Sequence, residues 1–230
     1  MATAGFNAVV KVAGTSTAFA NEATTKVTAN TVYQITDTAK RVIDPTVAVT
    51  VEVDADGAGA GGYVAAAAGT FTVDYTFGKV TFTADQGASA LVRISGNYLP
   101  LVTVGTAREA SVSVQNDLGD STVFGVTEKT AQPTLQSCSG SLGLLEDLLT
   151  DHDGGAGTQR FGDYLTAKTL KLVEIDFDGG GTQKFRGFVY FDDGSVKAAV
   201  GDLINSTINF KVAPQVGSGQ TEDAYFGFGS

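Results

Sequence analysis

The sequence contains one cysteine, one histidine and no tryptophan. Because Cys138 stands alone, the chain cannot form an internal disulfide, and this excludes a secreted scaffold held together by disulfides. We interpret Cys138 as a small buried residue on a strand. His152 has no second histidine with which to share a zinc ion, so we expect it in a solvent-exposed loop.

Motifs that would carry chemistry are also missing. No G-x-S-x-G segment is present to hold a nucleophilic serine. The segment that starts at Asp176 resembles a fragment of a calcium loop, but position twelve is Gly187, where the loop needs glutamate. Gly179–Gly181 lacks the Lys-Ser/Thr that follows a phosphate-binding loop. We therefore expect no catalytic residue, no metal site and no cofactor, and conclude that the chain is not an enzyme.

Basic residues are few and scattered. Fifteen Lys and Arg stand against 25 Asp and Glu, which gives a net charge of −10, and Lys40-Arg41 is the only adjacent basic pair. Such a surface repels phosphates, so specific binding of nucleic acid is not expected. No apolar run approaches the length of a bilayer span, and the first seven residues lack the pattern of a secretory signal. We expect synthesis in a cytoplasm and no membrane insertion.

The residues that are abundant favour strands and tight turns. The chain has 29 glycines and many Ala, Thr, Val and Ser residues, while the helix formers Glu, Lys, Gln and Leu are sparse. Apolar and polar residues alternate in about ten short segments, and one helix is expected near residues 158–167. We predict a single domain over residues 1–230, mainly β, with an antiparallel sandwich or barrel, one flanking α-helix and a long loop hairpin. The predicted strands are residues 8–12, 31–35, 47–54, 71–75, 80–83, 91–98, 108–115, 134–142, 170–177, 184–191 and 206–212.

Three segments lack core-forming side chains. Residues 54–69 are rich in Gly and Ala and are predicted to be a mobile loop between two strands. Residues 1–30 contain a polar Ala/Thr-rich stretch that we interpret as an extended arm or loop, and residues 214–230 are predicted to form a C-terminal arm.

Several segments, in order along most of the chain, resemble the major tail proteins (tail tube proteins) of siphophages. They are residues 39–45 (AKRVIDP), 73–82 (VDYTFGKVTF), 94–100 (ISGNYLP), 137–142 (SCSGSL), Phe161-x-x-Tyr164-Leu165, 174–176 (EID) and 186–188 (RGF). The resemblance implies a β-sandwich or barrel with one flanking helix. It also implies a virion protein, made in the cytoplasm of a bacterial host, that assembles into rings, usually hexamers.

Such rings stack into a hollow tube through which viral DNA passes without specific binding. The resemblance further implies tape measure, tail terminator and tail tip proteins as partners. Carboxylates on the polar faces of strands would suit a lumen to which DNA does not adhere. On this basis the lumen candidates are Glu52, Asp54 and Asp74, each of which could equally lie on an ordinary solvated strand face. The loop candidates for contact between rings are Asp56, Gly57, Gly59, Gly61, Gly62 and Tyr63.

Two other functions fit parts of the pattern. A capsid decoration or head-completion protein would share the acidic, Gly-rich β composition, but would bind capsids instead of forming tubes. A surface adhesin or carbohydrate-binding module would need an export signal and a cluster of exposed aromatic residues.

Overall fold

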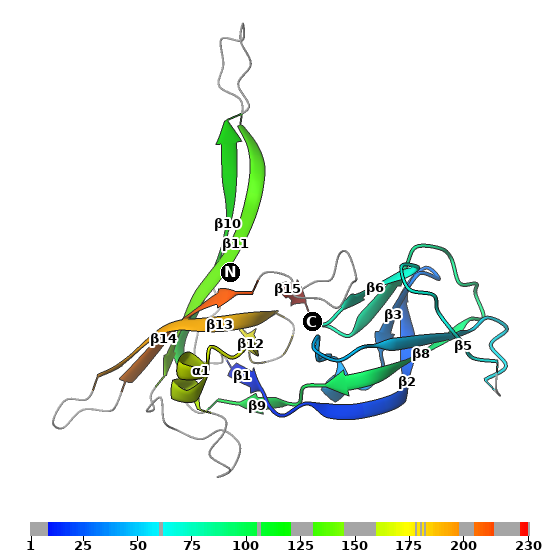
Figure 1. Cartoon of the computed structure of the whole chain (residues 1–230), viewed down its shortest axis with the longest axis horizontal. Coiled ribbons are helices and arrows are strands. Elements are labelled where there is room, and N and C mark those ends of the chain that lie inside the picture. The colour runs from blue at the N-terminus through cyan, green and yellow to red at the C-terminus, as the bar shows by residue number, and fades with distance from the viewer. Residues whose placement is uncertain are drawn as a thin grey trace, which may run out of the picture.

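The computed structural model describes residues 9–59, 62–104, 107–120, 131–144, 160–177, 179, 181, 183–197, 205–213 and 226–229. Within these residues the strands form two curled antiparallel sheets, each a half-barrel, and helix α1 (Phe161–Ala167) flanks one of them (Figure 1). The prediction of a mainly β fold with one flanking helix is confirmed. None of the described helices is long and apolar enough to span a membrane.

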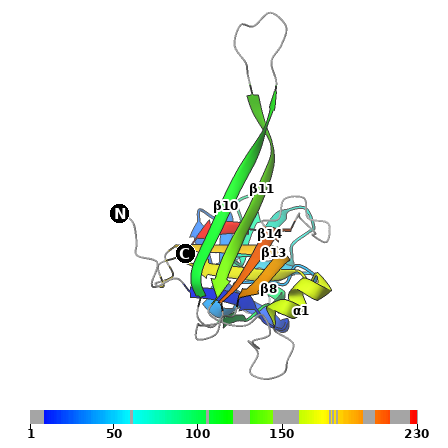
Figure 2. The ribbon, with the colours of Figure 1, turned by 90° about the vertical axis from the view of Figure 1, so that its left-hand side faces the viewer.

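The first lobe is built on the larger sheet. Its strand order is β10-β11-β14-β13-β12-β1-β9, and β15 pairs with β13 outside this path. The hairpin of β10 and β11 leaves the lobe and twists as it rises (Figures 1 and 2). The strands of this lobe are β1 (Val9–Ala13), β9 (Leu101–Thr103), β10 (Ala107–Asp120), β11 (Ala131–Leu144), β12 (Lys171–Asp176), β13 (Lys184–Lys197), β14 (Asn205–Val212) and β15 (Phe226–Gly229).

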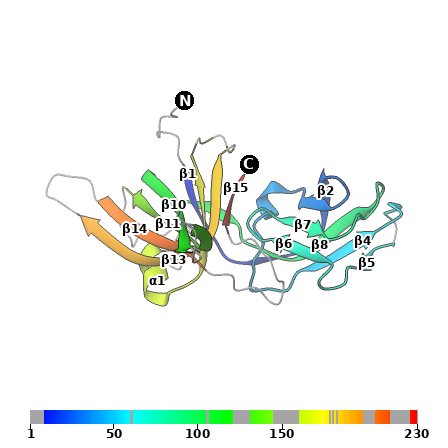
Figure 3. The ribbon, with the colours of Figure 1, turned by 90° about the horizontal axis from the view of Figure 1, so that it is seen from above.

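The second lobe is a continuous piece of chain placed between β1 and β9. Its strand order is β5-β4-β8-β2-β3-β7-β6, and it lies beside the first lobe (Figures 1 and 3). Where the chain crosses between the lobes, the Gly14 N–H donates to the Pro100 carbonyl at 2.7 Å. The elements are β2 (Thr17–Thr28), β3 (Val32–Ile35), the 3₁₀-helix η2 (Thr38–Lys40), β4 (Thr50–Asp54), β5 (Val64–Ala65), β6 (Phe71–Asp74), β7 (Lys79–Phe82) and β8 (Leu91–Tyr98).

Each lobe has its own hydrophobic core. In the first lobe α1 packs against β13, where the rings of Phe161 and Phe191 meet edge to face at 5.2 Å. Tyr164 and Leu165 join the same cluster, so these residues form the apolar face by which the helix packs on the core. Cys138 is buried in this core on β11, as predicted.

The two cores meet at the boundary between the lobes. Leu172 on β12 and Phe188 on β13 belong to the first sheet, yet both are fully buried in the core of the second lobe. On the same boundary β15 approaches Phe77, and a Cβ added at Gly229 would lie 2.9 Å from the Phe77 ring. The lobes therefore share buried apolar surface, which resists separation.

Most predicted strands are present, and β8 spans residues 91–98 as expected. The Ala/Thr-rich stretch within residues 1–30 was predicted to be an arm or loop, and this is wrong, because Thr17–Thr28 forms β2 between β8 and β3. Residues 1–8 and 214–225 lie outside the described residues. The end of the predicted C-terminal arm is β15, which pairs with β13.

The middle of the chain is more regular than expected. The strands predicted over residues 108–115 and 134–142 are longer in the structure, because β10 continues to Asp120 and β11 begins at Ala131. In residues 54–69, the predicted flexible loop contains strand β5, whose Val64 pairs with Val53 of β4. This part of the loop is held by backbone hydrogen bonds to the sheet.

Candidate functional site

Mostly uncharged polar side chains cover the outer side of β10, β11 and β14. Successive residues of a strand point to opposite faces of the sheet, so one set meets the core and the other faces outward. Ala110, Val112 and Cys138 belong to the inward set. We call the outward set the hydroxyl face: Ser111, Ser113, Ser137, Ser139, Ser141, Thr207 and Asn209, all exposed or half-buried.

The strand register places these side chains in rows across the sheet. Ser111 lies opposite Ser141, and Ser141 lies opposite Asn209. The Oγ atoms of Ser111 and Ser141 are 2.8 Å apart, a hydrogen-bond distance. In the next row Ser113 lies opposite Ser139. The hydroxyls can therefore bond to one another across the sheet. Two charged residues share this outward side, Glu109 on β10 and Lys211 on β14, so the surface has little net charge.

A glycine makes this arrangement possible. Gly140 lies on β11 between Ser139 and Ser141, with its missing side chain on the inward face. A Cβ built there would lie 2.2 Å from the carbonyl oxygen of Ser111 and 2.4 Å from the Phe210 ring. Both distances are far below van der Waals contact, so only glycine allows β11 to pack this closely on β10 and β14.

The charged residues beside the hydroxyl face are mainly acidic. A shallow groove on this side of the sheet is lined by several of its serines together with Asp192, Asp193 and Lys211. Lys211 is the one cation among the described lining residues, and its Nζ lies 2.8 Å from the Asp192 carboxylate. The hydrogen bond to Asp192 raises the pKa of Lys211. The cation is therefore already matched by a local anion.

Strand β10 forms one end of the larger sheet. Among the described strands it pairs only with β11, so its other edge carries backbone N–H and C=O groups with no strand beside them. Its 14 residues make an edge about 45 Å long. A long open edge is a template for pairing with another chain.

The carboxylates predicted to line a lumen lie in the second lobe, away from the hydroxyl face. Asp54 was expected on a solvated strand face, and this is wrong because it is only 1% exposed. The chain bends after β4, and the carboxylate accepts a hydrogen bond from the Gly59 N–H at 2.7 Å. Asp54 therefore fixes the start of the loop.

The other two predicted carboxylates are half-buried and engaged in local bonds. Glu52 on β4 pairs with Arg93 on β8 at 2.6 Å. Asp74 accepts hydrogen bonds from the backbone N–H groups of Thr76 and Phe77, which shapes the turn between β6 and β7. Their proposed place in a lumen stays a prediction that only an assembly can test.

The predicted inter-ring loop is partly pinned to the second lobe. The Arg93 guanidinium lies 4.0 Å from the centre of the Tyr63 ring. A Cβ at Gly57 would lie 2.3 Å from the Ser89 carbonyl oxygen, and Gly57 has a φ of +73°, so glycine is required there. Asp56 accepts from the Ala58 N–H. The other loop candidates are Gly59 and Gly62, which are described, and Gly61, which lies outside the described residues.

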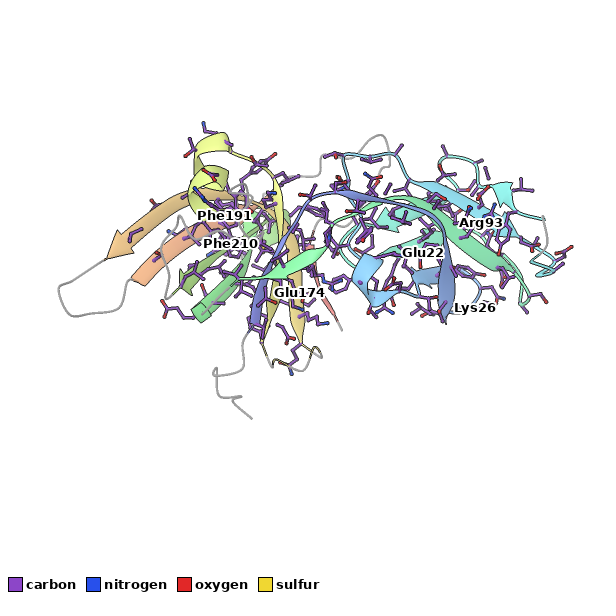
Figure 4. All side chains as sticks on the ribbon, turned by 90° about the horizontal axis from the view of Figure 1, so that it is seen from below. Glu22, Lys26, Arg93, Glu174, Phe191 and Phe210 are labelled. Atoms are coloured by element: carbon purple, nitrogen blue, oxygen red, sulfur yellow. The ribbon has the colours of Figure 1, made fainter. Side chains whose placement is uncertain are left out.

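A buried ionic cluster joins β1, β12 and β13. Glu174 is fully buried and receives Lys11 Nζ at 2.8 Å and Arg186 Nη2 at 2.6 Å. Arg186 also donates to the Thr76 carbonyl across the lobe boundary, at 2.9 Å. Figure 4 shows Glu174 where the first lobe faces the second. Burial alone would raise the pKa of Glu174, but the nearby charges of Arg186 and Lys11 outweigh it and lower the pKa.

Sequence reasoning missed both the hydroxyl face and the ionic cluster. The predicted strand over residues 108–115 contains Ser111 and Ser113 at alternate positions, and this alternation was the signal for the hydroxyl face. For the cluster, the hairpin of β12 and β13 places Glu174 directly opposite Arg186. Opposite charges at paired positions of a predicted hairpin indicate such a contact.

The described residues contain no group of three side chains able to hold a metal ion. Desolvation by burial raises the pKa of the Cys138 thiol, which disfavours the reactive thiolate. His152 lies outside the described residues. No protein-family model matches the chain, and no curated protein matches it.

Proposed function

We propose that the chain is a structural subunit that assembles into rings, and that the rings stack into the hollow tube of a phage tail. The observation that carries this proposal is the combination of one long open edge, on β10, with the hydroxyl face of the same sheet. The resemblance to siphophage tail tube proteins gives the proposal its virion setting. It is also the reason for naming tape measure, tail terminator and tail tip proteins as partners.

The open edge supports assembly with copies of the same chain. When β10 of one copy pairs with a strand of its neighbour, the unpaired backbone groups are satisfied, and a closed ring leaves no edge exposed. Repeating the same contact around a rotation axis closes a cyclic oligomer. The exposed apolar side chain of Val114 on β10, 38% accessible, would gain cover in such a contact.

The chemistry of the hydroxyl face supports a lumen that does not retain DNA. Tight non-specific binding of DNA comes from the release of counterions when Lys and Arg neutralise phosphates. The hydroxyl face offers serines, and the cation beside it, Lys211, is paired with Asp192. We therefore assign the hydroxyl face to the lumen.

Sheet geometry gives the size of such a ring. If each of six copies contributes β10, β11, β14 and β13, about 24 strands close into a barrel. With strands about 4.8 Å apart and tilted by about 40°, the backbone diameter is about 48 Å. Side chains reduce this to a lumen of about 35–40 Å, which is wider than a DNA duplex.

Contacts between rings need segments that project from the subunit. The hairpin of β10 and β11 is the largest projection, and β5, which follows Tyr63, lies at the outer side of the second lobe (Figure 1). We assign both to contacts with neighbouring subunits. The loop is partly ordered before assembly, so it loses less conformational entropy when it binds.

Sedimentation velocity over a range of protein concentrations, combined with negative-stain electron microscopy, tests the proposal. Rings or hollow tubes that grow with concentration are the expected result. A strictly monomeric particle at every concentration contradicts the proposal. Particles that assemble only on added capsids would support a capsid decoration protein instead.

A further inference from the structure

The boundary between the lobes contains a cavity that the assembly proposal does not use. Its volume is about 410 Å³, which lies within the range of small-molecule sites. The walls come from β1, β12 and β13 of the first lobe, and from η2, the residues just after it and the β6–β7 turn of the second. A ligand in this cavity would touch both lobes at once.

The charge of the cavity is opposite to that of the chain. Four cationic side chains line it, Lys11, Arg41, Lys184 and Arg186, and Glu174 is the only carboxylate among the lining residues that the structure describes. The whole chain carries −10. Cations are thus concentrated in this cavity at the boundary between the lobes.

Glu174 does not cancel this charge. It is fully buried and bonded to both Lys11 and Arg186, so one negative charge faces two positive charges. Arg41 and Lys184 add two more cations from opposite lobes, and the buried Asp176 lies opposite Lys184 in the strand register, so four cations stand against two carboxylates. The Arg41 guanidinium uses its Nε to donate to the Ile35 carbonyl at 3.0 Å, which leaves the other end of the group to face the cavity that it lines.

The cations also act on one another. Burial lowers the pKa of Arg41, and the repulsion from the nearby Arg186 lowers it further. Holding a second guanidinium near Arg186 therefore costs free energy in the folded chain. An anion placed between the cations would remove this cost, and charge-assisted hydrogen bonds from guanidinium groups to an oxyanion are among the strong ones.

We propose that this cavity between the lobes binds a small multivalent oxyanion of the phosphate class, held by Arg41 and Lys184 over the Glu174–Arg186 pair. Phosphate groups fit because a planar guanidinium bonds to two oxygens of one phosphate, and an ammonium adds a third contact. The volume accommodates more than one phosphate group, so pyrophosphate should bind more tightly than inorganic phosphate. Because both lobes contact the anion, its binding stabilises their arrangement. The proposal does not depend on ring or tube formation.

Isothermal titration calorimetry of the full chain with sodium pyrophosphate, and with inorganic phosphate, tests this site. Sodium chloride at equal ionic strength serves as the reference. We expect saturable binding near one anion per chain, with a thermal unfolding midpoint that rises with pyrophosphate and does not rise with chloride. Absence of binding beyond the chloride reference overturns the proposal.

Substitutions locate the site. Arg41→Gln and Lys184→Gln should each weaken pyrophosphate binding at least tenfold. Lys211→Gln removes the same charge beside the hydroxyl face, outside the lining of the cavity, and should change the affinity by less than twofold. If Lys211→Gln weakens binding as much as the other two, the anion binds by general charge and the site is refuted. If Arg41→Gln does not fold, Lys184→Gln and Lys211→Gln are compared alone. The site is supported if only Lys184→Gln weakens pyrophosphate binding, and it is refuted if both weaken it equally.

Discussion

The hydroxyl oxygens of Ser111 and Ser141 lie 2.8 Å apart across paired positions of β10 and β11. This contact is part of a sheet face on which serines meet serines from strand to strand. Such a face is polar enough to stay wet and has little charge. These are the properties required of a surface past which a polyanion slides without binding.

A cation placed on the hydroxyl face should make it adhesive to DNA. In Ser113→Lys, each subunit adds one positive charge to the proposed lumen, so tubes should still form but retain duplex DNA at about 50 mM salt and release it as salt rises. Co-sedimentation of tubes with labelled DNA measures this. Thr81→Lys, at an exposed position of β7 in the second lobe, is the matched control. Equal retention by both variants would show that the hydroxyl face is not the luminal one.

Gly140 should be intolerant of any side chain. In Gly140→Ala the added Cβ meets the Ser111 carbonyl oxygen and the Phe210 ring, and overpacking of this kind costs about 1–3 kcal/mol. Gly96 on β8 is a matched strand glycine, where a Cβ meets its nearest neighbour at 3.6 Å. Gly96→Ala should change the free energy of unfolding by less than about 0.5 kcal/mol. Urea denaturation measures both, and a similar loss in the two variants would contradict the packing described here.

Glu174 should be essential for stability at neutral pH. Glu174→Gln leaves Lys11 and Arg186 without their carboxylate, and breaking a buried ion pair in this way costs about 3–5 kcal/mol. The more exposed pair of Glu52 and Arg93 provides the control, since Glu52→Gln should cost less than about 1 kcal/mol. Chemical denaturation at pH 7 compares them, and equal losses would contradict a special role for the buried pair.

The contribution of Glu174 should also depend on pH. Its pKa is lower in the folded chain than the value of about 4.3 of an unfolded glutamate. The stabilisation is therefore complete above that value and is lost as the pH falls through the lower, folded pKa. The difference in unfolding free energy between the wild type and Glu174→Gln should shrink steadily below about pH 4. A difference that stays constant down to the acid transition would contradict this assignment.

The aromatic ring of Tyr63 should matter more for assembly than for folding. Tyr63→Ala removes the stacking of the ring on Arg93, a cation–π contact worth about 0.5–1 kcal/mol at an exposed site. Tube growth, followed by light scattering, should slow if the loop contacts the next ring. Arg93→Met, which removes the same contact but keeps the ring, is the comparison. If Tyr63→Ala forms tubes at the wild-type rate, the loop does not contribute to the contact between rings.

The sequence predicted those elements whose apolar residues alternate. Strand β8 was found because Val92 and Ile94 alternate with more exposed residues. Strand β2 was missed because only Phe19 of its twelve residues is buried, and because its register shifts between Phe19 and Glu22. A strand that is held mainly by backbone hydrogen bonds has almost no alternation of apolar residues by which its sequence could be recognised.

The site was predicted less well than the fold, for a physical reason. Alternation placed Asp54 on the solvated face of β4, but the chain turns at that residue and the carboxylate binds the Gly59 N–H instead. The alternation of residues predicts which face a side chain occupies only within the strand, and not at the residue where the strand ends. The cavity between the lobes brings together Lys11, Arg41 and Lys184, which are far apart in the sequence. No local pattern connects them.

A cryo-electron microscopy reconstruction of the particles formed by the purified chain at high concentration tests the central claim most directly. We predict a closed ring or stacked tube in which β10 of each subunit pairs with its neighbour, and in which Ser111 and Ser113 face an open lumen. A monomer at all concentrations would contradict this account, as would a ring that carries the hydroxyl face on its outer surface.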